Sequence, residues 1–214
     1  MKTALIAGAT GLVGQALLQK ILDSKYYSKL IVLVRNPLDI KHEKLVEYKI
    51  DFNTIAELTL DANIDDVFCC LGTTIKTAGS KAAFTKVDYS YVVQLAEWAN
   101  VHHCQQFSVI SSVGASTSTS NFYLKTKGDM EDAVGRLGLP GVHIYRPSLL
   151  IGQRNEFRLG EKIAAQLMRI SKPLFKGKLR KYQAITAEAL AQAMHHKAQL
   201  RVKGIYLYEG AEIV

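Results

Sequence analysis

A glycine-rich loop near the start of the chain constrains the fold more than any other feature. It reads Gly8-Ala9-Thr10-Gly11-Leu12-Val13-Gly14, follows an apolar run at residues 3–7 and leads into an amphipathic pattern at 13–22. A strand, a glycine loop and a helix in this order form the phosphate-binding turn of dinucleotide-binding βαβ units. The helix N-terminus offers unpaired N–H groups to the pyrophosphate. The residues expected to bind a dinucleotide are Gly8, Thr10, Gly11, Leu12, Val13 and Gly14.

The end of the second apolar run indicates which dinucleotide binds. NAD sites place Asp or Glu there, on the ribose 2′-hydroxyl, whereas this run ends in Val34-Arg35-Asn36. The planar guanidinium of Arg35 can pair with a 2′-phosphate, which a carboxylate would repel. The sequence therefore favours NADP(H) over NAD. A solvent-facing arginine at the end of a strand is the structural alternative.

Short apolar runs alternate with helical patterns along the first two thirds of the chain. Several runs show no polar alternation, which is typical of strands buried on both faces. Strands are expected at residues 3–7, 30–34, 44–50, 67–71, 106–111 and 142–145, and helices at 13–22, 84–100 and 123–137. This alternation predicts an α/β fold, namely a Rossmann-like doubly wound parallel sheet with right-handed crossovers.

The pattern changes after residue 147. The segment at about 148–183 is expected to form a short C-terminal substrate cap that contains a helix at 160–170. A helix at 186–198, with Thr186 as its N-cap, and a strand at 205–208 follow. Because 214 residues fit one α/β domain, we expect a single NAD(P)-binding Rossmann domain over 1–214.

The composition excludes several classes of protein. No apolar run approaches the roughly 20 residues of a membrane span, and the first residues lack the long apolar stretch of a signal peptide. A cytoplasmic protein is therefore expected. The cysteines Cys69, Cys70 and Cys104 are odd in number and lack metal-ligand spacing, so neither a disulfide framework nor a metal site is expected. We interpret them as small buried side chains.

The net charge of +8 raises the question of a polyanionic partner. The densest basic stretch, at 172–181, contains five basic residues and no acidic one, and we interpret it as a solvated loop. No helix-turn-helix, zinc-finger or RNA-binding signature accompanies it, so no nucleic-acid partner is expected.

A Tyr-x-x-x-Lys pair, Tyr123 and Lys127, opens the helix expected at 123–137. Residues four apart share a helix face, and this helix follows the strand that ends in Ser111-Ser112, at the ligand-binding edge of the sheet. A phenol with a pKa near 10 is a poor acid or base at neutral pH, but a nearby ammonium and a positive nicotinamide stabilise its phenolate. A serine hydroxyl can hydrogen-bond the substrate oxygen as charge develops. The structural alternative is an exposed tyrosine and a surface lysine.

The sequence resembles the atypical short-chain dehydrogenases/reductases, in particular the branch of the HIV Tat-interacting oxidoreductase-like protein and its small bacterial relatives. FCCLGTT is nearly specific for this branch, whereas the glycine loop is shared by the superfamily. The segments that carry the resemblance are GATGLVG (8–14), VR (34–35), DF (51–52), FCCLGTT (68–74), VD (87–88), SSVGAS (111–116), NFYLKTKGDMED (121–132) and YRPSLLIGQR (145–154).

The resemblance implies a Rossmann fold that binds NADPH and assigns roles to single residues. Tyr123 and Lys127 would be the catalytic pair and would also contact the cofactor. Ser112, by its register to the following Gly114, would be the third catalytic residue, with Ser111 as the alternative. Asp88 stands where many relatives carry Asn. The remaining cofactor contacts implied are Asp51 and Phe52 at the adenine and Leu71, Gly72, Thr73 and Thr74 along the cofactor.

Three functions fit these features. The first is an NADPH-dependent oxidoreductase acting on an unidentified carbonyl or hydroxyl substrate. The second is a non-catalytic NADPH-binding regulator or scaffold. The third is a nucleotide-sugar epimerase or dehydratase, although that family has a much longer C-terminal domain. We allow for a homodimer in each case.

Overall fold

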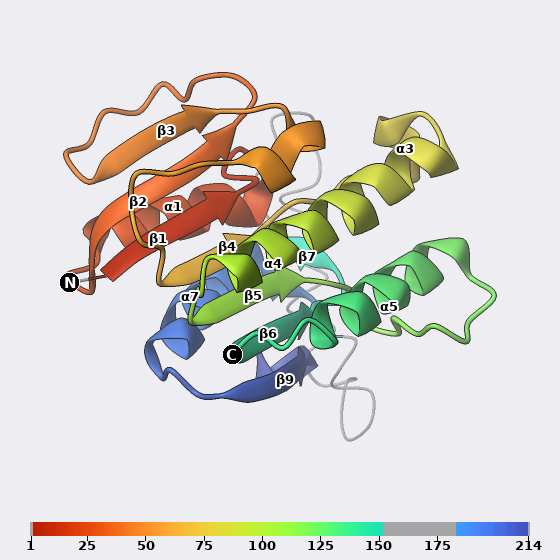
Figure 1. Cartoon of the computed structure of the whole chain (residues 1–214). Helices are drawn as coiled ribbons and strands as arrows, with labels where there is room; N and C mark the ends of the chain where they lie inside the picture. The colour runs from red at the N-terminus through yellow and green to blue at the C-terminus, as the bar shows by residue number, and fades with distance from the viewer. Residues whose placement is uncertain (1, 152–182, 214) are drawn as a thin grey trace.

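The computed structural model describes residues 2–151 and 183–213. Within them, seven parallel strands form one sheet in the order β3-β2-β1-β4-β5-β6-β9 (Figure 1). This confirms the expected Rossmann-like doubly wound sheet. The strands are β1 (Lys2–Ala7), β2 (Tyr27–Val34), β3 (Leu45–Lys49), β4 (Asp66–Cys69), β5 (Gln106–Ile110), β6 (Gly141–Arg146) and β9 (Gly204–Glu209).

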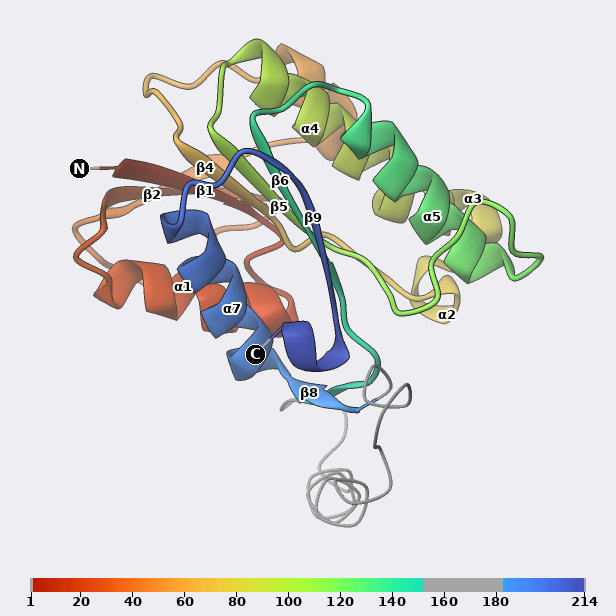
Figure 2. The same ribbon diagram turned by 90° about the horizontal axis from the view of Figure 1, so that it is seen from below.

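Helices cover both faces of the sheet (Figure 2). Helices α1 (Leu12–Asp23) and α7 (Ala187–Gln199) pack on one face, and α4 (Tyr91–Val101) and α5 (Phe122–Gly135) pack on the other. Each face has its own apolar core. The central strands are buried on both faces, which explains the uninterrupted apolar run at 30–34.

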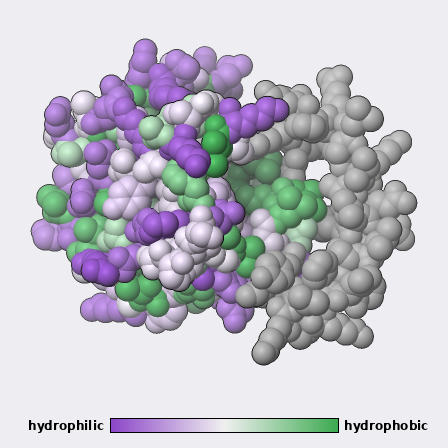
Figure 3. All heavy atoms as spheres, turned by 90° about the vertical axis from the view of Figure 1, so that its right-hand side faces the viewer, coloured by the Kyte–Doolittle hydropathy of each residue, from purple (hydrophilic) through white to green (hydrophobic). Residues whose placement is uncertain are grey.

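The strand order reverses between β1 and β4. Strands β2 and β3 lie on one side of β1, and β4, β5, β6 and β9 lie on the other. Loops that leave β1 and β4 at their carboxyl ends therefore diverge, and open α/β sheets bind ligands in the crevice between such loops. This edge faces the viewer in Figure 3, where apolar side chains gather in a hollow.

The prediction of one regular helix at 84–100 was wrong about where the helix begins and about its regularity. It begins with α3 (Lys81–Thr85), which Ser80 caps by accepting a hydrogen bond from the Ala83 N–H (3.1 Å). A π-helical turn, η2 (Lys86–Ser90), then separates α3 from α4. A π turn pairs residues five apart, and the apolar pattern of the sequence does not mark it.

Two short elements were not predicted either. The 3₁₀ helix η1 (Phe52–Glu57) and helix α2 (Ile75–Ala78) are too short to show an apolar period. Each depends on a cap instead, because Asp51 accepts from the Asn53 N–H and Thr74 accepts from the Thr77 N–H.

The C-terminal part agrees with the sequence in helix α7 and strand β9. Thr186 caps α7 by accepting from the Ala189 N–H (3.1 Å), as expected. A two-stranded parallel sheet of β7 (Leu150–Ile151) and β8 (Ile185–Thr186) was not predicted. Most of the expected substrate cap, including its helix at 160–170 and the basic stretch at 172–181, lies outside the described residues.

Candidate cofactor and active site

The glycine loop forms a tight turn at the carboxyl end of β1. Gly8 has a φ of +89°, and a Cβ built on it would lie 2.5 Å from the carbonyl oxygen of Cys70. A Cβ on Gly14 would collide with the backbone of Gly8, so α1 packs directly against the loop. Only glycine fits at these two positions. The first and third glycines of the loop therefore have the geometry that the dinucleotide-binding turn requires.

The outer side of the same loop is open. Gly11 is exposed, and a Cβ on it would meet nothing closer than the Gly8 carbonyl oxygen at 3.4 Å. Because Gly11 is the N-cap of α1 and carries no side chain, the first N–H groups of the helix are available to an anion. The loop thus fits a pyrophosphate. Of its other expected contacts, Thr10 is exposed, Leu12 is half-buried and Val13 is buried.

The segment after β4 runs beside the glycine loop. The Leu71 nitrogen would lie only 2.8 Å from a Cβ on Gly8, which places the two loops in contact. Gly72 is exposed, and the Thr73 N–H donates to Oδ2 of Asp88 at 2.8 Å. Thr74 caps α2. The structure therefore brings Leu71–Thr74 to the crevice where the sequence expected them.

The residues expected at the adenosine end lie at the ends of β2 and β3. Arg35 directly follows β2 and is exposed. Asp51 is exposed, and its carboxylate accepts from the backbone and side chain of Asn53 at 2.9 and 2.7 Å. Phe52 is buried, with its ring centroid 5.8 Å from that of Tyr91. Its side chain belongs to the core, so a cofactor contact at Phe52 would come from its backbone.

Tyr123 and Lys127 lie one turn apart on α5. Nζ of Lys127 lies 2.8 Å from Oδ1 of Asp88 and donates to the Ile110 carbonyl oxygen at 3.2 Å. The two charged side chains are only 4% and 2% exposed. Tyr123 is half-buried, and its ring centroid lies 5.5 Å from that of Phe84. The lysine ammonium is therefore fixed at the carboxyl end of β5, under the helix turn that carries the tyrosine.

Asp88 makes contacts that were not predicted from the sequence. It lies in the π-helical turn η2, and its two oxygens bind Lys127 and the Thr73 N–H. One carboxylate therefore joins the segment after β4 to the helix with the Tyr-Lys pair. π turns inside α-helices are frequent at functional sites. The sequence marked this residue only as an Asp where many relatives of the family carry Asn.

The serine segment after β5 lies against α5. Ser112 is half-buried, and its hydroxyl donates to the Val113 carbonyl oxygen at 3.4 Å. The Ser111 hydroxyl is buried and has no hydrogen-bond partner within the described residues. The Ser116 N–H donates to the Leu124 carbonyl oxygen at 3.2 Å. The structure thus brings both candidate serines to the edge that carries Tyr123 and Lys127.

Gly128 permits this close packing, although no pattern in the sequence distinguishes it from other helix residues. A Cβ on Gly128 would lie 2.6 Å from the Ser116 nitrogen and 2.7 Å from its Cα. Such distances exclude any side chain, so α5 and the serine segment touch through their backbones at this point.

An ion-pair cluster anchors the other half of α5. The guanidinium of Arg146, at the end of β6, binds both carboxylate oxygens of Glu131 on α5 and also binds Glu209 on β9 (2.9 Å). The Glu131 side chain is 8% exposed. Hydrogen bonding to Glu131 raises the pKa of Arg146, so the cation persists at any physiological pH.

The cysteines beside the crevice are not poised for chemistry. Cys69 is completely buried, and this burial raises the pKa of its thiol to about 12. Burial raises the pKa of Cys70 as well. Both thiols are therefore protonated at neutral pH, and a protonated thiol is a poor nucleophile. Cys69 therefore agrees with the interpretation as a small buried side chain, whereas Cys70 is half-buried.

Comparison with known proteins identifies the family. Residues 8–171 match the family model described as NAD(P)H-binding. Protein HTATIP2 of Rattus norvegicus is 36% identical over 167 residues, which cover 76% of this chain and 69% of that protein. Protein FMP52, mitochondrial, of Debaryomyces hansenii is 30% identical over 200 residues, 92% of this chain and 87% of that protein. The chain is an NAD(P)H-binding atypical short-chain dehydrogenase/reductase.

Solved structures support the fold of this family member. MoeE5 in complex with UDP-glucuronic acid and NAD aligns with a TM-score of 0.72 at 17% identity, over 97% of this chain and 76% of that one. Human epimerase family protein SDR39U1 with NADPH aligns with a TM-score of 0.64 at 16% identity, over 96% and 73%. The two structures hold different nicotinamide cofactors, so these alignments do not distinguish an NAD site from an NADP site in this chain.

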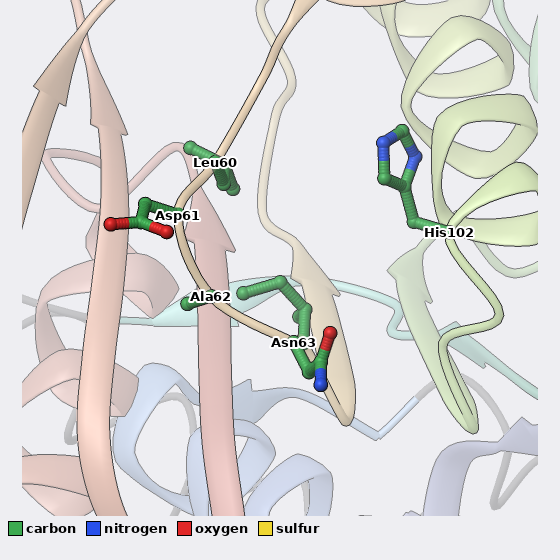
Figure 4. Close-up of a pocket in the computed structure, with 6 residues that line it drawn as sticks. Leu60, Asp61, Ala62, Asn63 and His102 are labelled. Atoms are coloured by element: carbon green, nitrogen blue, oxygen red, sulfur yellow. The ribbon is translucent and has the colours of Figure 1, made fainter.

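A second hollow lies at the opposite edge of the sheet (Figure 4). Its residues precede β4 or follow α4, so they lie at the amino-terminal side of the strands, away from the glycine loop. His102 there is engaged locally, with Nδ1 2.8 Å from the Trp98 carbonyl oxygen. The hollow therefore does not belong to the cofactor site. Its lining residues are Leu60, Asp61, Ala62, Asn63, Ile64 and His102.

Among residues 2–151 and 183–213, no group of three or more His, Cys, Asp or Glu side chains is placed to hold a metal ion. In the same part of the chain, none of the helices is both long and apolar enough to cross a bilayer. The names of the yeast relatives include the word mitochondrial, so a cytoplasmic location stays a prediction.

Proposed function

We propose that this family member is an NADPH-dependent oxidoreductase that acts on a carbonyl or hydroxyl group. The observation that carries the proposal is the position of Lys127. Its ammonium is buried at the carboxyl end of β5, one turn from Tyr123 and next to the segment that starts at Ser111. A buried lysine beside a tyrosine at the cofactor crevice is the arrangement that proton transfer by a phenol requires.

The residues of the crevice fit a dinucleotide. The open backbone at Gly11 and the N-terminus of α1 would hold the pyrophosphate, and Leu71–Thr74 would line its path. Arg35 would bind the 2′-phosphate through its planar fork, which is why we propose NADP(H) rather than NAD. When bound, NADPH supplies a hydride.

Each residue of the Ser-Tyr-Lys group would have a separate role. The Tyr123 hydroxyl would donate its proton to the substrate oxygen during carbonyl reduction and recover it from solvent. Ser112, the more accessible of the two serines, would donate a hydrogen bond to the same oxygen. Lys127 would stabilise the phenolate and contact the cofactor ribose. We propose that these groups belong to one NAD(P)-binding domain over 1–214, with the cap at about 148–183 shaping the substrate site.

One contact favours a second function, a non-catalytic NADPH-binding regulator. The Asp88 carboxylate, 2.8 Å from the Lys127 ammonium, compensates the positive charge that would stabilise a Tyr123 phenolate. In this case the bound cofactor would set the conformation that a partner protein recognises.

Tyr123→Phe distinguishes the two functions, because it removes one oxygen and preserves the ring packed near Phe84. An oxidoreductase should lose roughly 10²-fold or more in turnover, the usual scale for a positioned acid or base, with NADPH affinity nearly unchanged. The assay is NADPH oxidation with a panel of aldehydes, ketones and quinones, alongside NADPH binding measured by fluorescence. A wild-type rate that persists in Tyr123→Phe would refute the mechanism. If the wild type binds NADPH but none of the panel compounds causes NADPH oxidation, the regulatory function is favoured.

A further inference from the structure

Two exposed apolar side chains lie on either side of the candidate serines. Ile75, the first residue of α2, is 37% exposed and follows the carboxyl end of β4 (Figure 2). Leu149, between β6 and β7, is 61% exposed and follows the carboxyl end of β6. Strand β5, which leads into Ser111 and Ser112, runs between β4 and β6 in the sheet. The two apolar residues therefore flank the serine segment at the ligand-binding edge, where Figure 3 shows an apolar hollow.

The backbone around Leu149 is fixed although the side chain is exposed. Its carbonyl oxygen accepts from the Ile185 N–H at 3.0 Å, and the Val113 N–H donates to the Pro147 carbonyl oxygen at 3.0 Å. The second bond holds this segment beside the serines. The next residue, Leu150, packs against the core shared by α1 and α7. Leu149 is thus held at the crevice, with most of its side chain available to a ligand.

The three segments that follow β4, β5 and β6 in the crevice contain no charged residue. They read LGTTI (71–75), SSVGASTS (111–118) and PSLLI (147–151). Asp88 and Lys127, beside the first two segments, compensate each other's charge. Lys76, which follows the first segment, is exposed to solvent. Because a charged group that leaves water needs an opposite charge in its site, the described part of the crevice favours an uncharged substrate.

Several hydroxyl groups of these segments already have partners within the chain. The Thr74 hydroxyl accepts from the backbone of α2, and the hydroxyls of Ser116 and Ser118 lie 2.9 Å apart. The Ser148 hydroxyl donates to the Gln183 carbonyl oxygen at 2.6 Å. A sugar needs many hydrogen-bond partners, because a polar group buried without one costs free energy. A crevice with apolar side chains and few unpaired polar groups suits an apolar compound.

We propose that the substrate is an uncharged, apolar ketone, with Ile75 and Leu149 contacting the hydrocarbon on the two sides of its carbonyl group. This inference rests on the proposed oxidoreductase function. The carbonyl carbon receives a hydride from NADPH and the carbonyl oxygen receives a proton from Tyr123, which gives a secondary alcohol and NADP⁺. Ser112 follows the strand between the two apolar residues, so its hydrogen bond to the oxygen centres the carbonyl between them.

The first experiment compares methyl ethyl, methyl propyl, methyl butyl and methyl pentyl ketone as substrates for NADPH oxidation. The value of kcat/KM should rise about two- to fourfold with each methylene, because each one buries further apolar surface. The keto acid that carries a carboxylate in place of the terminal methyl group of methyl pentyl ketone should react about tenfold more slowly or worse. A flat series would overturn the substrate class and leave the oxidoreductase function standing. The same holds if the keto acid reacts as well as methyl pentyl ketone, as a contact with Lys76 would predict.

Two variants with matched controls test the two apolar residues. Leu149→Asn and Ile75→Thr replace apolar groups by polar ones of similar size, and each should lower kcat/KM for methyl pentyl ketone by about fivefold or more. Leu200→Asn and Val101→Thr are the controls, because these exposed apolar residues lie at the opposite edge of the sheet, after α7 and at the end of α4. The controls should retain the wild-type value. Equal losses in variants and controls would show that Ile75 and Leu149 do not contact the substrate.

A binding measurement separates this inference from the proposed function. The NADPH-bound full-length protein is titrated with Nile red, a neutral apolar dye whose fluorescence rises in apolar surroundings. Suppose that methyl pentyl ketone displaces the dye and Leu149→Asn weakens its binding, but no ketone is reduced. The oxidoreductase function is then refuted, and the apolar ligand site is supported. Absence of dye binding, or binding that Leu149→Asn and Leu200→Asn weaken equally, would overturn the apolar site whether or not a ketone is reduced.

Discussion

Replacement of Gly128 by alanine tests how α5 is held against the serine segment. The new Cβ would lie 2.6 Å from the Ser116 nitrogen, whereas ordinary contacts begin near 3.4 Å. The backbones must separate by most of an ångström, which also strains the hydrogen bond from Ser116 to Leu124. Overpacking of this kind costs about 1–3 kcal/mol and the hydrogen bond about 1 kcal/mol, against a gain of about 1 kcal/mol from alanine in a helix. We expect a net loss of about 1–3 kcal/mol in unfolding free energy.

Urea denaturation measures this loss, and Gly135→Ala is its matched control on the same helix. A Cβ on Gly135 would meet only Ile205 Cδ1, at 3.4 Å, so that variant should be neutral or slightly stabilised. Tyr123 lies on the displaced helix, and a shift of about 1 Å can reduce turnover by roughly 10²-fold. If both variants unfold at the same urea concentration, a close backbone approach at Gly128 does not hold α5 in place.

Two further substitutions test the cofactor end and the buried ion pair. Arg35→Ala should weaken NADPH binding by about 10- to 150-fold, the equivalent of a charge-assisted contact of about 1.5–3 kcal/mol. It should leave NADH binding unchanged. Equal losses of affinity for both cofactors in fluorescence titrations would contradict a contact between Arg35 and the 2′-phosphate. Asp88→Asn leaves the Lys127 ammonium buried without a counter-charge, so it should lower the unfolding free energy by on the order of 3 kcal/mol. A loss below about 1 kcal/mol in chemical denaturation would show that the Asp88–Lys127 ion pair is not needed for stability.

The sequence predicted those parts of the protein that depend on local pattern. The glycine loop requires a strand before it and a helix after it, and Gly8 and Gly14 are constrained by contacts within that unit or with its neighbour β4. The alternation of apolar runs and helical patterns was sufficient for the order of the main elements, because each buried strand and each amphipathic helix carries its own period.

The parts that were missed depend on contacts between distant segments. Asp88 acquires its position from a π turn, which leaves no mark in the apolar pattern. Gly128 is an ordinary helix residue until Ser116, twelve positions earlier in the chain, packs on it. The burial of Phe52 against Tyr91 likewise arises from tertiary packing, which the sequence did not predict.

His143 provides a prediction for the pH dependence of stability. It is completely buried, with Nε2–H donating to Oε1 of Gln106 (2.7 Å) and Nδ1 accepting from the Tyr208 hydroxyl (2.9 Å). Gln106 Nε2 donates to the Val202 carbonyl oxygen, which fixes the orientation of its amide. Every partner thus suits the neutral imidazole. Burial, with a smaller contribution from the Lys197 ammonium, lowers the pKa of His143 to about 4.

Because the folded protein resists protonation of His143 and the unfolded chain does not, stability from this residue is present above pH 6.5 and is lost as the pH falls toward 4. The difference of about 2.5 pKa units corresponds to about 3 kcal/mol. Carboxylates titrate in the same range, so the measurement compares wild type with His143→Phe, which keeps a ring between Tyr206 and Tyr208. Between pH 7 and pH 4, wild type should lose about 3 kcal/mol more unfolding free energy than the variant. Parallel losses in the two proteins would show that His143 is protonated as easily in the folded chain as in the unfolded one.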